Sequence, residues 1–215
     1  MTKHVQPSDL EFAALISSKI CHDVIGPVGA IYNGLEMIDE DGVSSSRSDT
    51  LEVVRNVAEQ ATARLQFARF AFGAAGSASV EIGLDQARQI SSGLAGDGKK
   101  YQIIWNETSG ALPKNQIKLL LNMIACALTS IPRGGTITVD VSRLGRSLKF
   151  ILKCTGRAVR APLYICELIA CPDSLEIDAL SVQAYYTLRL AGETGMRLSV
   201  EQHPDAVQLI AVADP

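Results

Sequence analysis

The sequence predicts an α+β protein in two parts: an N-terminal helical hairpin, followed by an α/β sandwich with one mixed sheet. Toward the N-terminus, apolar residues recur at spacings of three and four, the period of an amphipathic helix. Further along, helical segments alternate with strand-like ones. The change falls in the small-residue stretch 72–79, so we assign the hairpin to residues 1–76 and the sandwich to residues 80–215.

Two long helices build the predicted hairpin. The first is expected from Ser8 to about residue 40, with Ser8 and Glu11 at the spacing of a capping box. The second has a three-four seam over residues 51–72, and the serine-rich segment 39–48 predicts a turn between them. A hairpin buries one seam and leaves apolar surface uncovered, so a homodimeric four-helix bundle is the economical expectation. Packing of the hairpin on its own sandwich is the alternative.

The sandwich is predicted from changes in hydrophobic period and from turn residues. Helices are expected over residues 84–94, 117–131, 162–170 and 180–193, and strands over residues 101–105, 136–141, 148–154, 197–202 and 207–212.

Composition and charge exclude several classes of function. The formal net charge is −3 with no basic stripe, which argues against nucleic acid as a direct partner. No signal peptide is apparent, and the longest apolar stretch, near residues 119–128, is too short to span a bilayer, so no membrane association is expected. The five cysteines form neither a CxxC pair nor a metal-ligand spacing with histidine. We therefore expect a cytoplasmic protein with reduced thiols and no metal or cofactor of its own.

His22 is the most informative residue of the first helix. At about 100° per residue, the predicted buried stripe centres near Ile20, Ile31 and Ile38, and His22 lies roughly 200° away on the opposite face. Its neighbours on that face are small: Ser18, Gly26, Gly29 and Asn33.

Glycine and proline make this helix costly around the histidine. Each of the two glycines costs about 1 kcal/mol relative to alanine. Pro27 cannot donate to the main-chain carbonyl of Asp23 and should kink the helix. Such costs suggest a face shaped for close approach by another molecule. We expect the docking surface to comprise Ser18, Lys19, Ile25, Gly26 and Gly29.

The residue types around His22 suit phosphoryl transfer. A neutral imidazole is a good nucleophile near pH 7, and its attack on an aspartyl phosphate gives a phosphoimidazole that can be passed on again. Asp23 could orient the ring or act as its acid/base partner, and Lys19, one turn earlier, could offset phosphate charge. A solvated His–Asp pair without function is the alternative, which the glycines and the proline disfavour.

These residues resemble a known pattern. His22-Asp23 followed by Pro27 is similar to the phosphoacceptor box of sensor histidine kinases, H-[DE]-x-x-x-P, although Ile25 stands where a polar or basic residue is usual. Residues 120–139 resemble the asparagine box and next strand of the kinase ATP-binding domain, and residues 195–200 resemble the strand that closes that fold.

The nucleotide site of that fold is altered at several positions. By this resemblance, Cys126 replaces the magnesium-binding asparagine, while Cys154 and Ala158 replace the aspartate and second glycine of D-x-G-x-G. Residues 182–186, VQAYY, stand where a G-x-G-x-G lid would be. Because thiols and tyrosines offer neither hard oxygen ligands nor close backbone approach to phosphate, the alignment implies no ATP use.

A kinase-like hairpin that keeps its histidine beside an altered nucleotide site resembles the ChpT family of dimeric phosphotransferases. The resemblance covers nearly the whole chain. It implies that His22 accepts a phosphoryl group from the receiver domain of a hybrid kinase such as CckA, and donates it to response-regulator receivers such as CtrA and CpdR. Receivers carry their own magnesium, so no cofactor is implied here, and the sandwich would serve as a docking surface. An ATP-dependent sensor kinase and a non-catalytic regulator-binding scaffold are the alternatives.

Overall fold

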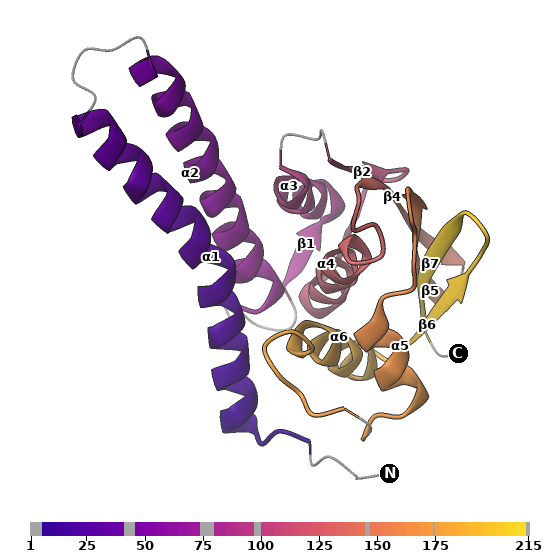
Figure 1. Ribbon diagram of the computed structural model, residues 1–215. Coiled ribbons are helices and arrows are strands. Elements are labelled where there is room, and N and C mark those ends of the chain that lie inside the picture. The colour runs from indigo at the N-terminus through magenta and orange to yellow at the C-terminus, as the bar shows by residue number, and fades with distance from the viewer. Residues whose placement is uncertain are drawn as a thin grey trace.

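The chain has a long helical hairpin and an α/β sandwich beside its base (Figure 1). The predicted α+β class is confirmed: two long helices come first, and strands and shorter helices follow. The predicted turn and linker lie largely outside the described residues. The computed structural model describes residues 6–40, 46–73, 80–96, 100–144, 147–173 and 175–213.

The hairpin consists of α1 (Asp9–Glu40) and α2 (Ser46–Ala71). The predicted capping box at the start of α1 is confirmed: the Ser8 amide donates to Oε2 of Glu11 at 2.8 Å, and the Glu11 amide donates to Oγ of Ser8 at 3.3 Å. Pro27 lies inside α1, which continues past it, and Figure 1 shows the helix changing direction about half-way along.

The main sheet has five strands in the order β2-β4-β5-β7-β6. β2 runs parallel to β4, and the remaining neighbours are antiparallel, so the predicted mixed sheet is confirmed. Its strands are β2 (Tyr101–Trp105), β4 (Gly135–Leu144), β5 (Ser147–Gly156), β6 (Met196–Gln202) and β7 (Ala206–Ala213). A separate antiparallel pair, β1 (Glu81–Gly83) and β3 (Ala111–Pro113), was not predicted, because a strand of three residues is too short to show alternation.

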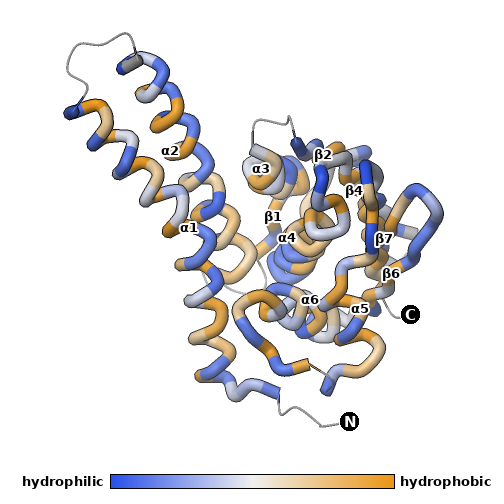
Figure 2. Tube along the Cα trace, in the orientation of Figure 1, coloured by the Kyte–Doolittle hydropathy of each residue, from blue (hydrophilic) through white to orange (hydrophobic). Residues whose placement is uncertain are grey.

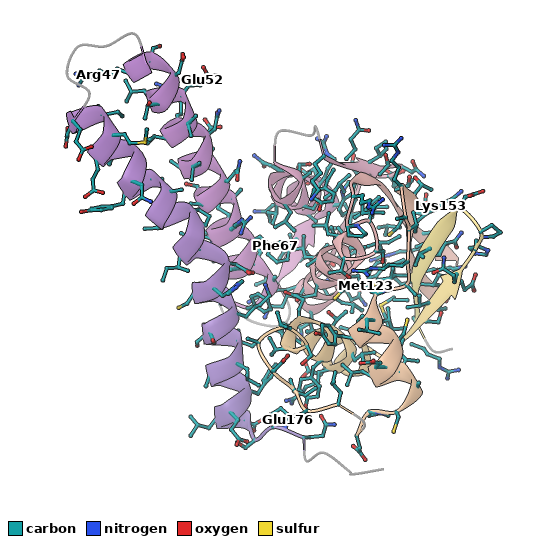
Figure 3. The ribbon with its side chains drawn as sticks, in the orientation of Figure 1. Arg47, Glu52, Phe67, Met123, Lys153 and Glu176 are labelled. Atoms are coloured by element: carbon teal, nitrogen blue, oxygen red, sulfur yellow. The ribbon has the colours of Figure 1, made fainter. Side chains whose placement is uncertain are left out.

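Helices cover one face of the sheet (Figure 1). The central helix, α4, begins at Lys114 and ends at Leu128, whereas the sequence placed it at residues 117–131; the amides of residues 129–131 turn back to carbonyls three residues earlier. Met123 of α4 is fully buried in the middle of the sandwich, and Lys153 lies at the sheet, away from that core (Figure 3). The other helices are α3 (Leu84–Ala95), α5 (Leu163–Ala170) and α6 (Val182–Glu193).

The base of the hairpin packs on the sandwich. Phe67 and Ala71 of α2 are buried in the same core as α4, and Figure 3 shows Phe67 on the side of α2 that faces the sandwich. On α1, the Phe12 ring lies 5.5 Å from Tyr185 and 5.7 Å from Tyr186, centroid to centroid. The predicted alternative, in which the hairpin covers part of its surface with its own sandwich, therefore holds for this half of the hairpin.

A row of large apolar side chains on α1 remains exposed. Only Ile38 is buried among the residues of α1, and Figure 2 shows hydrophobic segments along the whole helix. By length and composition alone, α1 could also cross a membrane, a test that core helices and signal sequences pass as well. We call the exposed row the apolar strip; it comprises Leu10, Ile25, Val28, Tyr32 and Leu35.

Candidate functional site

His22 projects from α1 with 77 % of its side chain exposed. Its Nδ1 lies 3.4 Å from Oδ1 of Asp23, the next residue in the helix. The other carboxylate oxygen of Asp23 accepts a hydrogen bond from Nζ of Lys19, one turn earlier. Asp23 thus links a cation on one side to the imidazole on the other, and Nε2 of His22 faces away from this pair.

The surface next to His22 is open. A β-carbon added to Gly26 or Gly29 would meet no atom within 4 Å, and Ser18 is also exposed. Ile25 is 71 % exposed, but it points about 60° around the helix from His22, toward the apolar strip. The residues expected to dock a partner therefore lie on two adjoining surfaces, one small and polar, the other apolar.

A cavity of about 650 Å³ lies between the hairpin and the sandwich, and His22 is at its edge. Lys19 and Asp23 line it from α1, Arg64 lines it from α2, and Arg160 lines it from the segment after β5. The Arg160 amide donates to the Ser130 carbonyl at 3.0 Å, which fixes that segment against the end of α4. Three cationic side chains and one carboxylate give this space a positive potential that suits a phosphoryl group.

The break in the α1 hydrogen-bond ladder is filled from α2. Pro27 has no N–H to donate to the Asp23 carbonyl, and Nη1 of Arg64 donates to that oxygen at 2.8 Å. Arg64 and Arg160 were not among the residues singled out from the sequence.

The two cysteines of the altered nucleotide site are buried. Burial raises the pKa of the Cys126 thiol to about 11, and that of Cys154 to about 12, so both are neutral at pH 7. Sγ of Cys126 lies 3.5 Å from Oγ1 of Thr187, and Sγ of Cys154 lies 3.7 Å from the Ala127 carbonyl. The described residues contain no group of three or more His, Cys, Asp or Glu that could hold a metal ion.

Asn122 lies in the segment that resembles the asparagine box; it is fully buried, and both of its polar atoms have protein partners. Its Nδ2 donates to the carbonyl of Ala71 at 3.1 Å and to that of Lys118 at 2.7 Å. Its Oδ1 accepts from Nε2 of Gln183. The side chain therefore ties the end of α2 to α4 and α6, and both of its N–H groups are used in these contacts.

Two further positions of this region, Tyr186 and Ala158, are defined by ring packing and by backbone conformation. Tyr186 packs on Phe72 with ring centroids 5.5 Å apart, so the segment where a lid would lie is held against the hairpin. Ala158 has φ 57°, a left-handed conformation that glycine adopts without strain. The backbone thus keeps the turn expected of a glycine although the side chain has changed.

A hairpin with an exposed histidine, joined to a mixed-sheet sandwich, is the arrangement of a histidine phosphotransferase, the class that the family comparison indicates. The family model "Histidine phosphotransferase C-terminal domain" matches residues 84–206. Protein phosphotransferase ChpT of Brucella abortus (strain 2308) is 42 % identical over 216 residues, covering 100 % of both chains. The chain belongs to the ChpT family of phosphotransferases.

One solved structure shares this fold over nearly the whole chain. A bacterial phosphotransferase superposes with a TM-score of 0.86 at 38 % identity, covering 98 % of this chain and 100 % of that one. A histidine kinase domain from Erythrobacter litoralis matches with a TM-score of 0.47 at 12 % identity, over 85 % of this chain and 94 % of that one.

Proposed function

We propose that this protein is a histidine phosphotransfer protein: His22 accepts a phosphoryl group from a receiver aspartate of a hybrid kinase and donates it to response-regulator receivers, without use of ATP. The observation that carries the proposal is the exposure of His22 on an open helix face, with Asp23 at Nδ1 and a cationic cavity beside it. Family membership supports transferase chemistry in general.

The arrangement suits an in-line transfer at Nε2. With the Nδ1–H donated toward Asp23, the lone pair of the neutral ring is on Nε2, which attacks the phosphorus of the aspartyl phosphate. The bond between the aspartyl oxygen and phosphorus breaks, and the receiver carboxylate leaves. Asp23 offsets the positive charge that develops on the ring, and Lys19 can pair with the phosphoryl oxygens. The reverse reaction, on another receiver, returns the phosphoryl group to an aspartate.

The partners follow from this chemistry. A receiver brings its own aspartate and magnesium, so the phosphotransfer protein needs an accessible imidazole and a docking surface. We assign docking to Ser18, Lys19, Ile25, Gly26 and Gly29, with receivers like those of CckA, CtrA and CpdR as donor and acceptors in the cytoplasm.

Two alternatives make different predictions. An ATP-dependent sensor kinase needs a nucleotide site, and the neutral thiols of Cys126 and Cys154 and the occupied Asn122 weigh against one. A non-catalytic scaffold would bind regulators without any need for His22.

A transfer assay tests all three. A receiver domain of a hybrid kinase is phosphorylated with labelled phosphate, purified and mixed with this protein. We expect label on the wild type and none on His22→Ala, with His203→Ala, another histidine with 46 % of its side chain exposed, behaving as the wild type. Labelling from ATP alone would favour the kinase, and equal labelling of wild type and His22→Ala would contradict the proposal.

We also propose a homodimer that forms through the apolar strip. Val28 is 51 % exposed and Tyr32 is 62 % exposed, and such a row is costly to leave in water. Light scattering should show a dimer for the wild type and a monomer for Val28→Glu. Ile104→Glu, on β2 and 47 % exposed, is the matched control and should stay dimeric. A monomeric wild type at high concentration would overturn this assignment.

A further inference from the structure

Arg64 of α2 contacts the turn of α1 that carries His22, and its role in transfer rests on His22 being the phosphoacceptor. In an α-helix, each carbonyl accepts from the amide four residues later. The amide missing in α1 is that of Pro27, and the carbonyl it leaves free belongs to Asp23, the residue next to His22. Pro27 therefore interrupts the main-chain hydrogen bonds of α1 at the turn that contains His22 and Asp23.

Arg64 fills that opening from the other helix of the hairpin. Its Nη1 lies 2.8 Å from the Asp23 oxygen, although the two residues are 41 positions apart in the chain. In the part of the chain that the structure describes, the ion pairs include none between Arg64 and a carboxylate. The guanidinium thus binds the backbone of the phosphoacceptor turn, and its charge stays on the cavity that His22 borders.

Asp23 is consequently held at two places. Its carboxylate binds Lys19 and faces Nδ1 of His22, and its carbonyl binds Arg64. Without Arg64 the carbonyl would be hydrated, since the site is exposed, so the fold would survive. What would be lost is the fixed position of the turn, and with it the direction of the imidazole.

We propose that Arg64 is a positioning residue for phosphotransfer, which replaces the hydrogen bond removed by Pro27 and so fixes the turn of α1 that carries His22 and Asp23. Because Pro27 removes a hydrogen bond within α1, the position of the His22 ring depends on a contact from α2. Arg64 acts through the backbone and not by binding the receiver.

A double-mutant cycle tests this proposal, because Pro27→Ala restores the missing amide. Labelling rates are measured for wild type, Arg64→Met, Pro27→Ala and the double variant, each over a range of phosphorylated receiver concentrations. We expect Arg64→Met to lower the maximal rate about tenfold, with the half-saturating receiver concentration changed less than about twofold. In the Pro27→Ala background the same substitution should cost less than about twofold. Arg64→Lys, which keeps a charged group that can donate to the Asp23 carbonyl, should recover most of the rate.

Three results would overturn the proposal. An equal loss in both backgrounds would mean that Arg64 acts through its charge, and a change confined to half-saturation would mean that it contacts the receiver. No loss in Arg64→Met would leave it without a role in transfer.

A second measurement separates this proposal from the proposed function. The carbonyl carbon shift of Asp23, measured by NMR, should move on Arg64→Met in the wild-type background and stay nearly constant in Pro27→Ala. If His22 takes no label, the proposed function fails while the shift still reports whether Arg64 holds the turn; an unmoved shift contradicts the positioning role itself. If Pro27→Ala alone abolishes transfer, the Asp23 carbonyl shift still tests whether Arg64 binds that carbonyl.

Discussion

The surface around His22 and the buried region around Cys126 and Cys154 differ in almost every physical respect. Around His22 the surface is polar and open, with no atom within 4 Å of a β-carbon added to Gly26. Around Cys126 and Cys154 the groups are buried, neutral and satisfied by protein atoms. The proposed function needs the first region to meet a partner protein, whereas the second region is packed in the core of the sandwich. Equivalent substitutions should therefore change transfer in one and stability in the other.

The largest effect is expected for a charge placed in the buried region. Cys154→Asp would restore the carboxylate of the kinase pattern, but in a fully buried position on β5. We expect the free energy of unfolding to fall by at least about 3 kcal/mol, as urea denaturation would measure, because a carboxylate loses its hydration in this buried position. Cys154→Ala, the matched control, should cost about 1–2 kcal/mol. Tight ATP binding by a stable Cys154→Asp variant would show that the buried region can act as a nucleotide site, contrary to this expectation.

The opposite behaviour is expected at the open site. Gly26→Leu places a bulky side chain one turn from His22 in free space, so transfer from a receiver should slow about tenfold or more. Unfolding should become harder by about 0.5–1 kcal/mol, because leucine favours the helix over glycine.

Gly192 on α6 is the matched control for this substitution, since a β-carbon there also meets no atom within 4 Å. Gly192→Leu should gain stability similarly while leaving the transfer rate unchanged. If Gly26→Leu transfers at the normal rate, the open face is not the docking surface.

A smaller effect is expected at Ala158, where the backbone keeps a glycine-like turn with φ 57°. Ala158→Gly relieves left-handed strain but adds freedom to the unfolded chain, for a net gain of about 0.5 kcal/mol in unfolding free energy. Thermal denaturation would detect it. Ala158→Gly should not gain nucleotide binding, since the buried thiols of Cys126 and Cys154 remain. If Ala158→Gly lowers the free energy of unfolding, the backbone at residue 158 is not strained.

The smallest effect is the pH dependence of the α1 cap. The hydroxyl and amide of Ser8 donate to Glu11 and lower the pKa of that carboxyl below its ordinary value of 4.5. The cap therefore stabilises the fold above about pH 4.5 and loses this contribution as the pH falls through the lowered pKa. The difference in unfolding free energy between wild type and Glu11→Ala should be larger near pH 6 than near pH 3. A difference independent of pH would rule out the carboxylate as the capping group.

The fold could be predicted where periodicity is long. The spacing in residues 8–40 and 51–72 predicted both helices of the hairpin, and the alternation of helices and strands in the sandwich followed from changes in hydrophobic period and from turn residues. The predictions were weakest at short or buried elements. β1 and β3 have three residues each, and α4 is buried nearly all round, so its apolar pattern did not mark where it begins.

The site could be predicted only in part, because sequence spacing shows one helix at a time. His22, Asp23 and Lys19 share one helix, so their proximity follows from the spacing of three and four. Arg64 comes from the other helix, and its contact depends on hairpin register. A turn near residue 43 places residue 23 opposite residue 63 or so, and the free carbonyl at Asp23 called for a donor there. These two facts together would have found it.

The hydrogen bond from Asn122 to the Ala71 carbonyl has a consequence for how the hairpin opens. It anchors the last turn of α2 in the core of the sandwich, next to buried Phe67, while the far end of the hairpin has little to cover it. Amide hydrogen exchange should therefore form a gradient along α2, fastest near Ser46 and slowest near Ala71. Arg64 lies toward the end expected to exchange slowly, so the turn with His22 is hydrogen-bonded to the half of the hairpin that should open least often.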